Sequence, residues 1–107
     1  MPNGTSERET MDGSPARIEL KRGERDCGYI KFQTGPEPEG INGTTIEAVL
    51  EVLLNRLRGF QRGRFMCREN ALAITKLEEG LFWLWRRTQL RREQGVEGTD
   101  QAHLSNP

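Results

Sequence analysis

Histidine and cysteine, on which many catalytic and metal sites depend, are almost absent from this sequence. It contains one histidine, His103, and two cysteines, Cys27 and Cys67, among 107 residues. The cysteines form no metal-binding pattern, and no Ser/His/Asp or Cys/His pair can be assembled. No phosphate-binding glycine loop of the GxxxxGK[ST] type appears either. The sequence therefore argues against an enzyme, and we expect neither a metal nor a cofactor.

A net charge, a long apolar run and an apolar leader are also lacking. The 16 Lys and Arg residues balance the 16 Asp and Glu residues, whereas proteins that bind DNA or RNA polymers usually carry a basic excess. The apolar runs fall far short of the roughly 20 residues that cross a bilayer. Residues 1–15 are polar, unlike a secretory leader. We therefore expect a soluble chain with reduced thiols that binds neither nucleic-acid polymers nor a membrane.

The chain does contain the patterns of one small domain. Only 34% of its residues are hydrophobic and 30% are charged, and a domain of this size buries a modest core and often gains from self-association. We expect an α+β fold, in which a small N-terminal antiparallel β-sheet is followed by an antiparallel two-helix hairpin, and we expect it to be oligomeric. The predicted segments are a disordered leader (1–15), a small β-sheet region (17–43), a helical hairpin (44–95) and a C-terminal tail (96–107).

Alternation of apolar and polar residues predicts the strands. Ile18 and Leu20 alternate with charged neighbours, and Ile30 and Phe32 do the same further on. Residues 23–26 read as the turn between these two strands. After the glycine- and proline-rich residues 35–40, Ile41 is expected to add a short edge strand.

Helical spacing predicts two helices joined by a short connection, which makes them antiparallel neighbours. The first starts at a capping box formed by Thr44 and Glu47 and ends before Gly63. The second runs from about residue 68 to residue 94. The apolar stripe of the first helix is Ile46, Leu50, Leu53, Leu57 and Phe60, broadened by Val49, Val52 and Leu54. The stripe of the second helix is Asn70, Ile74, Leu77, Leu81, Leu84, Thr88 and Arg91.

Four polar or aromatic residues in this hairpin have both a structural and a functional interpretation. Arg87 and Arg91 lie one turn apart and can converge on one phosphate, or simply complement the helix dipole. Asn70 can cap its helix or read the edge of a base. Phe60 can be a core aromatic or a platform on which a base stacks.

The spacing of these residues constrains the functional interpretation. Asn70 and Arg87 are 17 residues apart on one helix, or about 25 Å at a rise of about 1.5 Å per residue. A mononucleotide-sized ligand cannot span that distance, so one chain cannot offer both groups to it. Two chains with antiparallel long helices can, and the extra apolar faces at Phe82, Trp83 and Trp85 favour such packing. A functional site would therefore lie between protomers.

Several motifs in residues 17–99 resemble a known family, the phage Thoeris anti-defence sponges. The hairpin also resembles the phage sponge that counters cyclic-oligonucleotide (CBASS-type) signalling. These motifs are Tyr29-Ile30-Lys31-Phe32-Gln33, Gly40-Ile41-Asn42-Gly43, Leu57-Arg58-Gly59-Phe60-Gln61, Cys67-Arg68-Glu69-Asn70-Ala71-Leu72-Ala73-Ile74-Thr75-Lys76-Leu77-Glu78-Glu79, Arg86-Arg87-Thr88 and Gly95-Val96-Glu97-Gly98-Thr99.

The resemblance implies a non-enzymatic dimer or hexamer in the host bacterial cytoplasm. Such proteins bind glycocyclic ADP-ribose signals without degrading them, and hexameric members hold cyclic oligonucleotides at separate sites. Carried over, Phe60 would stack on adenine, Asn70 would hydrogen-bond near it, and Arg87 and Arg91 would hold the phosphates. Gly98 and Thr99 would belong to the cyclic-oligonucleotide site. Two alternatives stay open, an enzyme that cleaves the cyclic messenger and a purely structural oligomerising hairpin.

Overall fold

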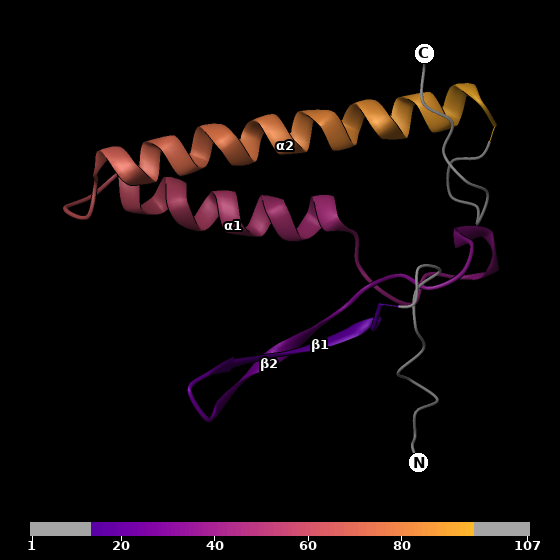
Figure 1. Ribbon diagram of the computed structural model, residues 1–107, viewed down its shortest axis with the longest axis horizontal. Helices are drawn as coiled ribbons and strands as arrows, with labels where there is room; N and C mark the ends of the chain where they lie inside the picture. Colours follow the sequence, from indigo (N-terminus) through magenta and orange to yellow (C-terminus); the bar gives the residue numbers. More distant parts are fainter. Residues whose placement is uncertain (1–13, 96–107) are drawn as a thin grey trace. The chain divides into compact units, whose positions relative to one another are not determined.

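The computed structural model describes residues 14–95, which divide into two compact units (Figure 1). The first unit contains residues 14–45 and the second residues 46–95. The leader predicted at residues 1–15 lies outside the described residues except for its last two. The predicted tail, with Gly98 and Thr99, lies entirely outside them. The order of strands and helices is that of the predicted α+β fold.

The first unit contains a two-stranded antiparallel sheet, as predicted. Strand β1 (Arg17–Arg22) pairs with strand β2 (Arg25–Lys31), with Ile18 opposite Ile30. The turn is shorter than predicted, because β2 already begins at Arg25. Gly23 allows this tight turn, since its φ of 64° lies in the left-handed region that favours glycine.

The predicted edge strand at Ile41 is wrong. Ile41 belongs to no strand and its side chain is 81% exposed. The residue that pairs is Thr44, which forms an isolated parallel bridge with Phe32. Between them, the 3-10 helix η2 (Glu37–Glu39) interrupts the chain.

Two side-chain amides hold the segment between Phe32 and Thr44 in a defined loop. Gln33 donates from Nε2 to the Gly40 carbonyl (2.9 Å) and accepts from the Asn42 amide (2.9 Å). Asn42 pairs in turn with both backbone groups of Thr34. A Cβ on Gly43 would clash with the Phe32 carbonyl group, so this position requires glycine. These contacts explain why the chain places Asn42 and Gly43 together.

The second unit is the predicted antiparallel hairpin of helix α1 (Ile46–Gln61) and helix α2 (Arg68–Glu93). Helix α1 lies along α2 for most of its length, and α2 continues past it (Figure 1). In the described part of the chain, neither helix combines the length and apolarity of a bilayer span.

The predicted capping box at the start of α1 is wrong. The Thr44 amide donates to the Lys31 carbonyl (2.8 Å), so it is not available to Glu47. The Glu47 carboxylate instead contacts Arg87 and Thr88 of α2. Glu47 therefore joins the two helices rather than capping one of them.

The core of the hairpin is narrow. Among the described residues of this unit only Leu54 is fully buried, although Leu53 stands at the centre of the predicted stripe and is half-exposed. The apolar residues of α1 occupy two overlapping sides of the helix, but a single neighbouring helix can cover only one of them. Helix α2 covers the side that contains Leu54.

Candidate ligand-binding site

Phe60 and Asn70 come together at the loop end of the hairpin. Phe60 lies in the last turn of α1 and Asn70 in the first turn of α2, and both are half-buried. Phe65, in the loop between them, connects the two. Its ring meets that of Phe60 edge to face at 6.1 Å between centroids, and its carbonyl accepts a hydrogen bond from Asn70 Nδ2 (3.2 Å).

Asn70 is not the helix cap. That position belongs to Cys67, whose Sγ accepts from the Asn70 backbone amide (3.4 Å). Cysteine is not among the usual capping residues, so nothing in the sequence pointed to it. With its backbone satisfied by Cys67, the Asn70 side chain is left for the loop and for anything that docks beside it.

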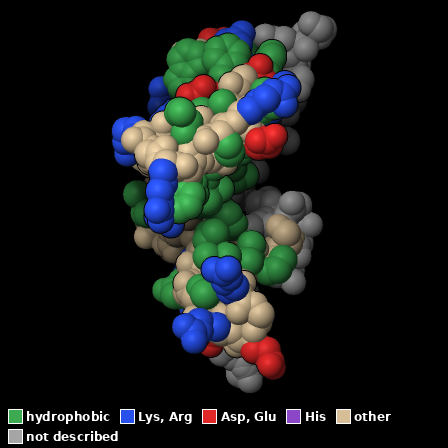
Figure 2. All heavy atoms as spheres, turned by 90° about the vertical axis from the view of Figure 1, so that its left-hand side faces the viewer, with side chains coloured by type: hydrophobic (Ala, Val, Ile, Leu, Met, Phe, Trp, Pro, Cys, Tyr) green, Lys and Arg blue, Asp and Glu red, His purple; other side chains and the backbone are tan. Residues whose placement is uncertain are grey.

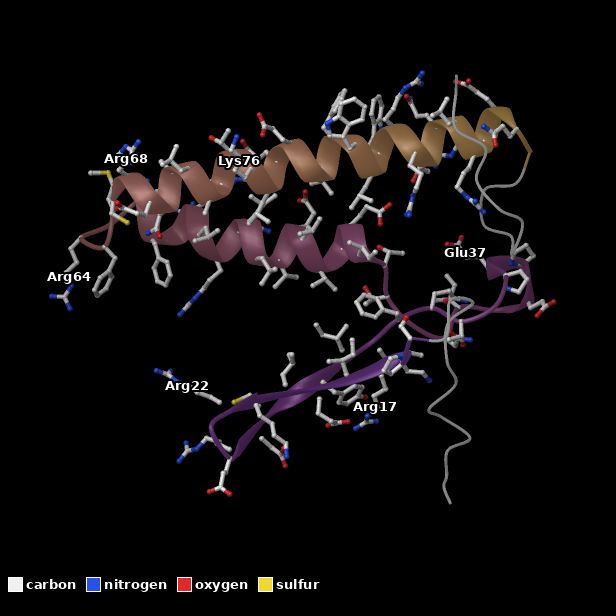
Figure 3. All side chains as sticks on the ribbon, in the orientation of Figure 1. Arg17, Arg22, Glu37, Arg64, Arg68 and Lys76 are labelled. Carbon is white, nitrogen blue, oxygen red and sulfur yellow. The ribbon has the colours of Figure 1, made fainter. Side chains whose placement is uncertain are left out.

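Arginines surround the aromatic pair. The Arg56 guanidinium lies over the Phe60 ring, 4.9 Å from its centroid, and that of Arg64 lies over Phe65 at 5.0 Å. Figure 3 shows Arg64 and Arg68 at this same end of the hairpin. A ring with a cation on one face keeps its other face for stacking. The loop end thus combines aromatic faces, an amide edge and positive charge, which suits a nucleotide base with a nearby anion.

Arg87 and Arg91 lie toward the other end of α2. Arg91 is in the last turn, where a cation complements the helix dipole. Arg87 lies before that turn, and its Nη2 is 3.8 Å from Glu47 Oε2. Thr88 donates to the same carboxylate at 3.4 Å. Glu47 therefore orients Arg87. No sequence pattern predicts this contact, because Thr44 and Glu47 have the spacing of a capping box.

The two pairs of residues do not meet within one chain. Asn70 and Arg87 lie on one uninterrupted helix, so the separation of about 25 Å expected from helical rise stands. The structure thus brings Phe60 and Asn70 together and leaves Arg87 and Arg91 as a separate candidate half-site. Nor do the described residues gather three side chains that could hold a metal ion.

Comparison with known proteins shows the family to which the chain belongs. Residues 28–89 match the family described as "Acb2/Tad1, hairpin domain". The chain is also 43% identical, over 90 residues, to a curated relative named "Thoeris anti-defense 1" from Bacillus phage SBSphiJ7. The matched region covers 83% of this chain and 63% of that relative. Since the family match covers more than half of the chain, including the end of strand β2, all of α1 and most of α2, the chain belongs to the Acb2/Tad1 hairpin-domain family.

Proposed function

We propose that the chain is a phage anti-defence protein that binds and sequesters cyclic ADP-ribose-type immune signals. In these signals the ring of ADP-ribose is closed by a 1″–2′ or 1″–3′ linkage. The protein would bind the signal in the host bacterial cytoplasm without degrading it, and so prevent activation of the Thoeris effector. Membership of the Acb2/Tad1 family and the name of the curated relative support this proposal.

The observation that carries the proposal is the presence of two chemically different half-sites at separate places along the helical hairpin. Phe60 and Asn70 provide a ring and an amide, which suit the adenine of such a signal. Arg87 and Arg91 provide planar guanidinium groups, which suit its two phosphates. A cyclic ADP-ribose carries both parts within one small molecule, so it requires both half-sites at once.

Two copies of the chain would supply them. Helix α2 exposes Phe82 (53%), Trp83 (67%) and Trp85 (52%). Figure 3 shows Lys76 on the side of α2 away from α1, and Trp83 follows it by two helical turns, on the same side. Figure 2 shows apolar side chains gathered on this side of the hairpin, among acidic and basic ones. Exposed aromatic clusters of this kind mark protein–protein contacts. We propose that they hold a dimer or hexamer in which each ligand lies between protomers.

A sequestering protein must bind more tightly than the effector it competes with. A Kd of about 10 nM corresponds to about −11 kcal/mol. A two-chain pocket that stacks one base and clamps two phosphates with charge-assisted hydrogen bonds is sufficient for this.

A second kind of ligand follows from the family alone. We propose that cyclic di- or trinucleotides of CBASS signalling bind at separate sites that include Gly98 and Thr99. Both residues lie outside the described part of the chain. The proposal is based on the motif Gly95-Val96-Glu97-Gly98-Thr99.

The test of sequestration is recovery of the ligand. The protein is mixed with a cyclic ADP-ribose isomer, the complex is separated from free ligand, and the protein is then denatured by heat. Chromatography of the supernatant should show the intact cyclic compound. Linear ADP-ribose alone would mean that the protein is an enzyme that cleaves the messenger. No binding heat in calorimetry at micromolar protein, with each isomer, would mean a purely structural oligomer.

A further inference from the structure

One side chain closes the loop between the two helices. Gln61, the last residue of α1, donates from Nε2 to the Cys67 carbonyl (3.2 Å) and accepts from the Cys67 amide at Oε1 (3.0 Å). A carboxamide that pairs with both backbone groups of one residue fixes that residue as a neighbouring strand would. Gln61 therefore ties the end of α1 to the residue that caps α2.

The hydrogen-bond network continues from Cys67 to the half-site formed by Phe60 and Asn70, here called the base half-site. Cys67 Sγ accepts from the Asn70 backbone amide (3.4 Å), and Asn70 Nδ2 donates to the Phe65 carbonyl (3.2 Å). Phe65 in turn places its ring against that of Phe60. The positions of Phe65 and Asn70 thus depend on a loop that Gln61 holds closed.

This network fixes which way the Asn70 amide faces. A carbonyl oxygen can only accept, so the amino group of Asn70 must point at Phe65 and its Oδ1 must point elsewhere. Among the described residues, no donor is bonded to Oδ1. Asn70 therefore presents an acceptor, Oδ1, beside the one N–H that Phe65 does not use.

An edge of this kind distinguishes between purines. Adenine presents an amino donor beside a ring-nitrogen acceptor. The donor matches Asn70 Oδ1, and the acceptor matches the remaining N–H of Asn70. Hypoxanthine has an oxygen in place of that amino group, so an acceptor would face Oδ1. A reversed Asn70 amide would remove this distinction, because the amino group could then serve the hypoxanthine oxygen.

We propose that Gln61 is a positioning residue for base recognition, because its bonds to Cys67 hold Asn70 in the orientation that selects adenine over hypoxanthine. The inference rests on the proposed function, since it requires that a purine nucleotide binds beside Phe60 and Asn70. Gln61 itself need not touch the ligand.

The experiment compares two ligands, a cyclic ADP-ribose isomer and its hypoxanthine counterpart, by calorimetry. The test variant is Gln61→Met, which keeps the length of the side chain and removes both hydrogen bonds. The matched control is Asn55→Met, a carboxamide on the same helix whose contact is a 3.4 Å bond from Arg58. The wild type and the control should prefer the adenine ligand. Gln61→Met should bind the adenine ligand about tenfold more weakly. The ratio of its affinities for the adenine and hypoxanthine ligands should fall toward one.

Loss of preference, rather than loss of affinity alone, separates positioning from general damage to the fold. If Gln61→Met fails to fold by circular dichroism, Gln61→Glu replaces it, because Glu still accepts from the Cys67 amide but cannot donate to its carbonyl. Its preference should lie between those of the wild type and a ratio of one. Wild-type preference in the variant that folds would overturn the inference and leave the proposed function intact. No binding of either ligand by the wild type would overturn both.

Discussion

Individual residues in the hairpin have roles that depend on neighbours far away in the sequence. Arg87 and Glu47 are 40 residues apart, yet their charged groups lie 3.8 Å from each other. Since the Arg87 side chain is 45% exposed, solvent weakens this pair and it adds little stability. The contact matters more for direction than for energy. It holds the Arg87 guanidinium beside a half-buried carboxylate, from which a phosphate of the proposed ligand would have to draw it.

The arginine pair is expected to be essential for binding and dispensable for assembly. Replacing both Arg87 and Arg91 with Ala removes the two donors assigned to the phosphates but leaves the exposed aromatic residues of α2 in place. Calorimetry with a cyclic ADP-ribose isomer should show no binding, while gel filtration shows an unchanged oligomer.

The matched control for that variant replaces Arg22 and Arg25 with Ala. These two residues lie opposite each other in the sheet and carry the same total charge. The control should bind like the wild type. If the Arg87→Ala, Arg91→Ala variant binds as tightly as the control, the phosphate assignment is wrong.

At the scale of elements, the sequence predicted what local patterns determine. The ends of α2 were predicted within one residue, because polar residues and Gly95 bound a long helical pattern. The paired strands were also predicted. What failed were contacts made across the chain. Thr44 pairs with Phe32 rather than capping a helix, and the bonds of Gln61 to Cys67 leave no periodic signal. Phe60 and Asn70 lie at the same end of the hairpin, but no pattern in the sequence predicts the loop contacts that join them.

The stability of the hairpin should depend unusually strongly on Leu54. It is the one fully buried side chain among the described residues of this unit, so its truncation creates a cavity that few neighbours can fill. Leu54→Ala should lower the free energy of unfolding by about 2–5 kcal/mol. Thermal unfolding followed by circular dichroism measures this. Val52→Ala, at an exposed position of the same helix, should shift the midpoint only slightly. Equal shifts would mean that the core lies elsewhere.

At the scale of the whole molecule, the proposed oligomer would account for both the candidate half-sites and the exposed aromatic residues. Phe82, Trp83 and Trp85 form ring contacts among themselves, at 5.5 Å and 6.1 Å from Phe82, yet remain more than half exposed. Burying such a cluster against a second copy would stabilise an oligomer. Antiparallel packing of two α2 helices would also bring the loop end of one copy beside Arg87 and Arg91 of the other. The assembly would then be a condition for binding.

Mixing two defective variants tests this directly. One double variant, Phe60→Ala with Asn70→Ala, lacks the groups assigned to the base. The other, Arg87→Ala with Arg91→Ala, lacks the groups assigned to the phosphates. Neither variant alone should bind a cyclic ADP-ribose isomer. In a symmetric dimer of one copy of each, one of the two sites takes both intact halves, while the other takes both defective ones. Random exchange of equal amounts makes half of the dimers mixed, which restores roughly one quarter of the wild-type sites. Calorimetry after co-refolding should therefore show binding at about that stoichiometry, with wild-type affinity. If a single chain holds the whole ligand, the mixture should not bind it, because every copy is defective by itself. Absence of binding by the mixture would therefore rule out a site shared between protomers.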